Sequence, residues 1–181
     1  MISVVVKAPP ELSRRMNRYP KGKWSDEGKI VHIMEDRYYT RGHMWVKKTP
    51  EGYFRIGITD YAQKVLQDSG QADIAIIEIY KKTGEEVEAG ELFGTIYGTY
   101  YVNFDYMGYE TMAFDLTAPV SGEIVEVNTR VIENPVLINT DPYGEGWIIT
   151  IAPKGDVYEL ISPIRYKKIL TQKEKSPFRI M

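Results

Sequence analysis

The chain has 181 residues, of which 43% are hydrophobic and 27% are charged, a composition typical of one globular domain with its own core. It has no cysteine, which excludes disulfides, thiolate metal sites, iron–sulfur clusters and cysteine nucleophiles, and only His32 and His43 are available for imidazole chemistry. No apolar run is long enough to cross a membrane and the first residues lack a signal-peptide pattern, so the sequence predicts a cytoplasmic protein.

The formal net charge of −2 hides an uneven distribution. Residues 83–153 contain twelve acidic side chains and one basic side chain, Arg130, so this span carries about −11 and the rest of the chain about +9. Two interpretations remain open: the basic ends fold onto the acidic middle, or the middle offers an acidic face to a basic partner. An acidic centre argues against nucleic-acid binding through the core.

Residues 1–38 are predicted to be an N-terminal extension that packs on the core. A short strand is expected over Val4–Val6, and the pair Pro9-Pro10 ends it. The alternation of KIVHIM at 29–34 predicts a second strand. The polar, basic stretch between them, 11–29, is typical of irregular structure or a short helix.

Short strands separated by Gly, Pro and Asn turns are predicted along the rest of the chain. In order, the expected elements are strands at 42–48 and 53–58, a helix from Thr59 to Leu66, a strand at 73–80, a long hairpin at 92–117, a strand at 123–127, a helix at 129–133, a strand at 147–151, a helix at 157–161 and a helix from Pro163. Residues 171–181 are predicted to be a charged, loose end. This pattern indicates a mainly β protein, a sandwich or flattened barrel with short peripheral helices and a C-terminal helix.

The stretch from 94 to 122 is the most strongly patterned part of the sequence. Apolar side chains alternate along both arms of the predicted hairpin, and the turn is expected near Met107-Gly108. A long apolar face has to be covered, and three covers are possible: the N-terminal extension, a second copy of the chain, or another protein or ligand. The candidate partner contacts are Tyr100, Tyr101, Phe104, Tyr106 and Tyr109.

Acidic side chains gather just before the hairpin, at Glu85, Glu86, Glu88 and Glu91. This candidate acidic face is interpreted mainly as a solvated surface, and without histidine nearby no metal site is expected. His43 is interpreted as a structural hydrogen-bonding residue. No Ser/His/Asp arrangement, phosphate loop or dinucleotide fingerprint occurs, so the sequence predicts a protein that is not an enzyme.

Several blocks between Tyr39 and Leu160 stand in a recognisable order. They are His43–Val46 (HMWV), Gly57–Gln63 (GITDYAQ), Val87–Glu91 (VEAGE), Ala118–Asn128 (APVSGEIVEVN) and Asn139–Ile148 (NTDPYGEGWI). Together they resemble the glycine cleavage system H protein family, whose fold is a flattened barrel-sandwich hybrid related to lipoyl and biotinyl domains. The resemblance implies an extension at 1–38, an H-protein-like domain at 39–161 with a hairpin insertion at 95–117, and a C-terminal helix and tail at 162–181.

The resemblance also implies where a prosthetic group would be attached. In that family a lipoyl group on one lysine at a hairpin tip carries an aminomethyl unit between partner enzymes. Counting back from Ala118 places this lysine at Thr111, and counting forward from the Phe-Gly pair before the hairpin places it at Tyr100, a difference of about 11 residues. No lysine occurs between Lys82 and Lys154, and lipoylation needs a primary amine, so we expect no lipoyl cofactor.

Three hypotheses about function follow. The favoured one is a non-lipoylated H-protein homologue that binds or scaffolds proteins, with lipoyl-pathway enzymes as possible partners and with a homodimer through the hairpin also possible. The second is a true lipoyl carrier that uses a lysine elsewhere, such as Lys81 or Lys154. The third is a small-molecule binder that uses the aromatic hairpin as a pocket.

Overall fold

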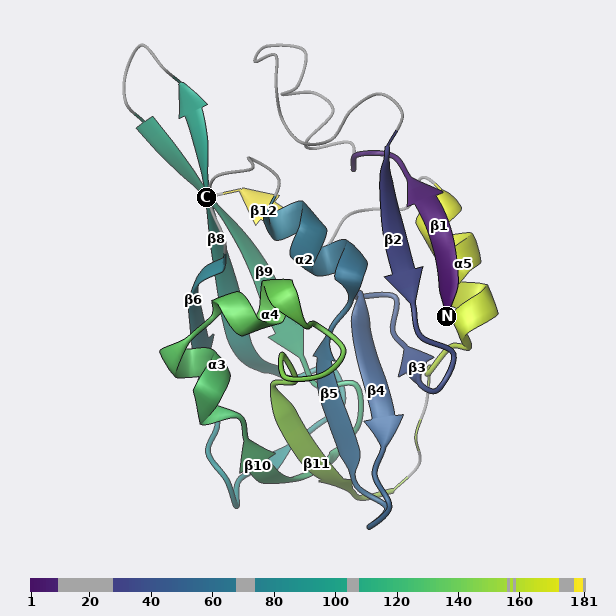
Figure 1. Cartoon of the computed structure of the whole chain (residues 1–181). Coiled ribbons are helices and arrows are strands. Elements are labelled where there is room, and N and C mark those ends of the chain that lie inside the picture. The colour runs from purple at the N-terminus through teal and green to yellow at the C-terminus, as the bar shows by residue number, and fades with distance from the viewer. Residues whose placement is uncertain are drawn as a thin grey trace.

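The computed structural model describes residues 1–9, 28–67, 74–103, 108–155, 157, 159–172 and 178–180, with the backbone alone at 74–75, 99–103, 108–111 and 178–180. Within these ranges the strands form two larger sheets and a separate two-stranded ribbon, and all neighbouring strands are antiparallel (Figure 1). With only short helices beside them, this arrangement confirms the predicted mainly β, flattened barrel-sandwich fold.

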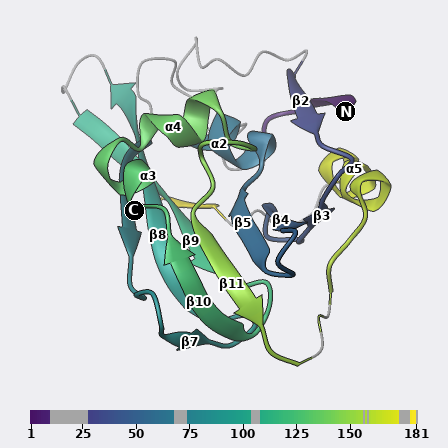
Figure 2. The same cartoon turned by 60° about the horizontal axis from the view of Figure 1, so that its bottom comes forward.

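The larger sheet has the strand order β3-β4-β5-β11-β10-β7. Its strands are β3 (Tyr38–Tyr39), β4 (Met44–Lys48), β5 (Phe54–Ile58), β11 (Ile149–Pro153), β10 (Gly122–Val127) and β7 (Glu86–Val87). The second sheet has the order β12-β9-β8-β6. Its strands are β12 (Phe178–Ile180), β9 (Gly108–Thr117), β8 (Leu92–Asn103) and β6 (Ile74–Ile79). Figure 2 shows how the two sheets curve around a common interior.

One hydrophobic core joins both sheets. Ile56 of β5 and Ile151 of β11 are fully buried, as are Ile96 of β8 and Phe114 of β9. In β5 the residues 56–58 are buried and in β11 the residues 149–151, three in a row in each strand, so both faces of these strands are removed from water there. Of these four residues, the period-two pattern read from the sequence identified Ile96 and Phe114 on the arms of the hairpin.

Side-chain caps set where the short helices begin. Helix α2 (Asp60–Leu66) starts at Thr59, whose hydroxyl accepts from the backbone N–H of Ala62 at 3.2 Å, as predicted. Asn128 caps α3 (Thr129–Glu133) and Ser162 caps α5 (Pro163–Thr171) in the same way. Helix α4 (Val136–Thr140) was not predicted from the sequence.

The predicted helix at 157–161 is wrong for the residues that the structure describes there. Residues 157 and 159–161 are not helical, and Ile161 instead pairs with Tyr39 through two backbone hydrogen bonds of 2.9 Å. This bridge pairs the backbone N–H and carbonyl groups on the outer side of the short strand β3, and Ile161 is buried. Tertiary pairing therefore overrides the local helical pattern.

The prediction of a loose C-terminal end is also wrong for residues 178–180. These residues form β12, with Phe178 opposite Phe114 and Ile180 opposite Met112 of β9. Without β12, this side of β9 would present unpaired backbone groups beside a buried apolar stretch. The tail therefore completes the edge of the smaller sheet.

The N-terminal ribbon consists of β1 (Ile2–Val6) and β2 (Lys29–Ile33), paired with Val4 opposite Val31. One face of the ribbon is buried, and it joins the main core. The ribbon packs against α5 through β1 and against α2 through β2 (Figure 1). Residues 10–27 lie outside the described residues, and they include most of the stretch 11–29 that was expected to be irregular or a short helix.

Candidate functional site

The candidate site is the arm formed by β8 and β9. The register pairs Thr99 with Thr111 and Tyr100 with Glu110. Thr111 and Tyr100, the two positions obtained by counting from either side, therefore lie one step apart on facing strands. Backbone pairing continues beyond them, with Tyr101 opposite Tyr109, so the extra residues lengthen the hairpin past the level of the family's attachment point.

The base of the arm is packed tightly into the body. A Cβ atom on Gly98 would lie 2.5 Å from the carbonyl oxygen of Leu66, so only glycine lets α2 approach the strand this closely. Across the strand pair, Met112 and Phe114 are buried in the core. The arm thus leaves the body just past Gly98, and Figure 1 shows its outer part projecting beyond the sheets.

The structure settles the covering of the arm only at its base. There the core and α2 cover the apolar face, while the ribbon β1–β2 packs on α2 and α5. The partner contacts predicted farther out on the arm stay predictions. For Tyr100, Tyr101 and Tyr109 only the backbone is described, and Phe104 and Tyr106 lie outside the described residues.

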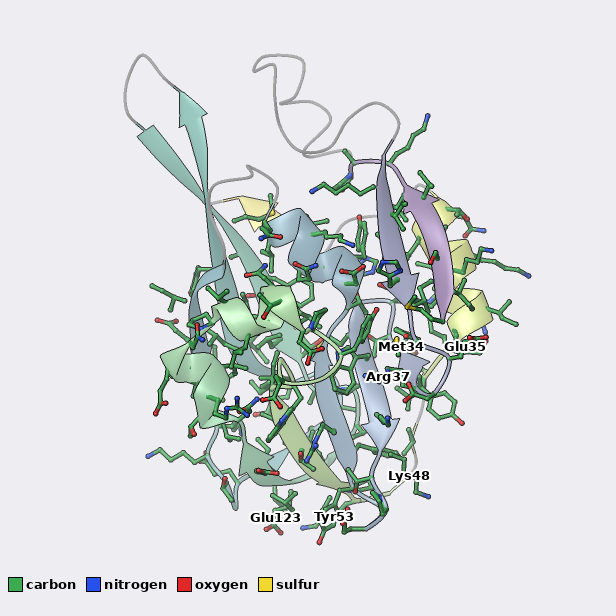
Figure 3. The ribbon with its side chains drawn as sticks, in the orientation of Figure 1. Met34, Glu35, Arg37, Lys48, Tyr53 and Glu123 are labelled. Carbon is green, nitrogen blue, oxygen red and sulfur yellow. The ribbon has the colours of Figure 1, made fainter. Side chains whose placement is uncertain are left out.

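The predicted acidic residues lie around a groove of about 390 Å³ next to β7. Glu86, Glu88 and Glu91 line it together with Lys154, whereas Glu85 accepts from the backbone N–H of Lys82. Figure 3 shows Glu123, which pairs with Glu86 across β10 and β7, at the end of the molecule opposite the arm. The acidic groove and the arm are therefore separate surfaces.

Both alternative attachment lysines are engaged at this groove. Lys154 forms an ion pair with Glu86, and Lys81 lies 2.6 Å from a carboxylate oxygen of Glu91. The hydrogen bonds that the two amines donate to these carboxylates raise the pKa of each amine. The same bonds lower the pKa of Glu86 and Glu91.

His43 is structural, as predicted. Its Nδ1 lies 2.8 Å from the hydroxyl of Tyr166, which also lies 2.9 Å from the hydroxyl of Thr59. Burial lowers the pKa of His43 to about 3, so the imidazole is neutral at ordinary pH. In the described part of the chain no cluster of three or more His, Cys, Asp or Glu residues could hold a metal ion.

One polar set was missed by the sequence analysis. Asp60 and Lys64 on α2, with Tyr143 from the loop after α4, contact the backbone of β2. The spacing of Asp60 and Lys64, which puts an acid and a base on one helical turn, was the available signal. The loop carrying Tyr143 is 83 residues away from Asp60, so no local pattern could have joined them.

The curved antiparallel sheets, the single core and the projecting hairpin define the class of the protein, a barrel-sandwich of the lipoyl-domain type. The family model described as "Glycine cleavage H-protein" matches residues 37–173. The chain is 41% identical over 142 residues to the glycine cleavage system H protein of Carboxydothermus hydrogenoformans, covering 77% of this chain and 95% of the relative. It is 39% identical over 143 residues to that of Thermus thermophilus, covering 77% and 97%.

Comparison with solved structures agrees. The crystal structure of a glycine cleavage system H protein from Mycobacterium marinum superimposes with a TM-score of 0.60 at 35% identity, covering 75% of this chain and 97% of that one. The chain therefore belongs to the glycine cleavage H-protein family. Its members are carriers rather than catalysts, so the prediction that this protein is not an enzyme is confirmed. None of the described helices is both long enough and apolar enough to cross a membrane.

The residues of the arm do not fit the family's lipoyl group. Neither Tyr100 nor Thr111 has an amine, and the sequence has no lysine anywhere from 83 to 153. Both positions also lie within paired strands instead of at a turn. The arm thus differs from a lipoyl-carrying hairpin in two ways: it has no amine for attachment, and the expected attachment positions lie within strands.

Proposed function

We propose that this protein is a cytoplasmic, non-lipoylated H-protein homologue that binds other proteins through its lengthened arm. The observation that carries the proposal is the register at Tyr100 and Thr111, where the family's amine is missing and paired backbone continues outward. An added length of about 5 residues in each strand corresponds to roughly 17 Å of extra reach. Enzymes of a lipoyl-dependent or neighbouring pathway are the proposed partners, because the rest of the family fold is kept.

A lipoyl carrier is the second candidate, and the names of the curated relatives favour it. It would require attachment at a lysine outside the arm, such as Lys81 or Lys154. Both amines are held in ion pairs at the groove beside β7, away from the arm. The geometry therefore supports the binding protein over the carrier.

The contact role of the arm predicts a loss of partner binding when its aromatic side chains are removed. Changing Tyr100, Phe104 and Tyr106 together to Ser should reduce recovery of partner proteins from native cell extract by about tenfold or more, because interfaces depend on a few aromatic anchors. Quantitative mass spectrometry of the recovered proteins measures the effect.

Two exposed tyrosines outside the arm provide the matched control. Tyr38 and Tyr53 should be changeable to Ser without loss of partners, since Figure 3 shows Tyr53 at the opposite end of the molecule. Equal recovery by all three proteins would contradict the contact role. If a second copy covers the arm, sedimentation will instead show a wild-type dimer that the arm variant converts to monomer.

A further inference from the structure

The ribbon β1–β2 lies before residue 37, where the family match begins, yet family residues hold it in place. Among the described strands, β2 pairs with β1 alone. On its other side, where a neighbouring strand would pair, the backbone of β2 meets side chains. This arrangement is separate from the arm and independent of its proposed function.

Four side chains bind backbone groups at alternate positions of this segment. Lys64 Nζ donates to the carbonyl oxygen of residue 30 at 2.8 Å, and the N–H of residue 32 donates to Asp60 Oδ2 at 2.8 Å. The hydroxyl of Tyr143 donates to the carbonyl oxygen of residue 32 at 2.6 Å, and that of Tyr39 donates to the carbonyl oxygen of residue 34 at 2.7 Å. Side chains thus form the hydrogen bonds to this edge of β2 that the backbone of a neighbouring strand would otherwise form.

The four side chains are themselves fixed. Asp60 Oδ2 lies 2.7 Å from Lys64 Nζ, and Asp60 Oδ1 accepts from Gln63 Nε2 at 2.7 Å. The backbone N–H of Asp60 donates to the hydroxyl of Tyr143 at 3.2 Å. Burial raises the pKa of Tyr143 well above its usual range and that of Tyr39 to about 12, so both hydroxyls remain donors.

Side-chain recognition is confined to the residues between these positions. Val31 and Ile33 are fully buried in the core, whereas Ile30 is 57% exposed. The site therefore binds the main chain at 30, 32 and 34 and takes branched apolar side chains at 31 and 33. Any extended segment with that alternation satisfies the same contacts.

We propose that Asp60, Lys64, Tyr143 and Tyr39 form a strand-binding site, which β2 fills within the same chain. The partner that fits it is an extended protein segment with branched apolar side chains at two alternate positions, which takes the place of β2. Exchange is feasible because a two-stranded ribbon has little stability of its own and the larger sheet is complete without it. The ribbon thus acts as a cover over a binding face of the family domain.

The test uses the full chain and a fluorescent peptide with the sequence of residues 28–36, GKIVHIMED. Wild-type protein should bind this peptide weakly because the site is occupied. The variant Val31→Asp, whose own strand can no longer be buried, should bind it at least tenfold more tightly, and adding Asp60→Asn should remove that gain. A peptide with Asp in place of Val31 and Ile33 should not bind.

Folding of each variant is checked by the fluorescence of the buried Trp45. If Val31→Asp unfolds the protein, Val31→Ala, which shortens the side chain without adding a charge, takes its place. Hydrogen exchange of the wild type gives a second readout: amides of β2 should exchange at least tenfold faster than those of β5. The proposal would be overturned if the amide hydrogens of β2 exchanged as slowly as those of β5, or if the two peptides bound equally well.

Discussion

Lowering the pH from 6.5 to about 4.5 is expected to reduce the free energy of unfolding by roughly 2–3 kcal/mol through His43 alone. His43 is fully enclosed, and burial lowers its pKa from 6.5 to about 3. In this pH range the unfolded chain takes up a proton at this residue and the folded chain does not. The stabilisation is therefore complete above pH 6.5 and is lost progressively as the pH falls toward 3.

Urea unfolding at a series of pH values measures this effect, with His43→Asn as the comparison. Asparagine tolerates the positive φ of 59° at this position and does not titrate. Burial tends to raise the pKa of Asp36, but its hydrogen bonds with Arg37 and Lys47 bring the pKa down to about 2. The stability that Asp36 contributes is therefore lost mainly as the pH falls from 3.8 toward 2, below the range used for His43. Equal pH dependence of wild type and His43→Asn between 6.5 and 4.5 would refute the assignment.

Replacing Trp45 by Ala is expected to cost about 3–5 kcal/mol of folding stability. The indole is 1% exposed, and its N–H donates to the carbonyl oxygen of Pro142 at 2.9 Å. The guanidinium of Arg37 stacks on it at 4.7 Å, and a Cβ on Gly57 would lie only 2.7 Å from its ring. Three of the family's sequence blocks therefore meet at this one side chain.

Trp147 is the matched control. It is only half-buried and stacks on Arg55 at 4.5 Å, so Trp147→Ala should cost no more than about half as much as Trp45→Ala. Thermal and denaturant unfolding of the two variants provide the comparison. Similar losses would show that the indole of Trp45 is not the centre of the packing that joins the blocks.

Local patterns predicted much of the fold. The turn at 49–52 located β4 and β5, the hydroxyl of Thr59 marked the start of α2, and Gly52 takes the positive φ of 89° in the turn before β5. The recognisable blocks predicted the family, and they contain core residues such as Trp45, Ile58 and Ile124 as well as exposed residues such as Glu88 and Glu145. The missing amine could be read directly because it depends on residue type alone.

Contacts between distant segments explain what the sequence did not predict. Ile161 is drawn from a helical pattern into a bridge with Tyr39, and the hydroxyl of Tyr166 meets His43, 123 residues earlier. In the tail, Phe178 and Ile180 flank Arg179 with period two, a strand signal obscured by charged neighbours. The contacts of Asp60 with β2 likewise depend on how α2 is placed, which no local pattern encodes.

We propose that the arm of this H-protein homologue does not carry a lipoyl group. The most direct test is the intact mass of the chain produced in a lipoylation-competent host, together with the Thermus thermophilus relative as a positive control. We predict that the chain has the mass of its unmodified sequence while the control gains one lipoyl group. A gain of one lipoyl group by this chain, mapped to Lys81, Lys154 or any other lysine, would contradict the account.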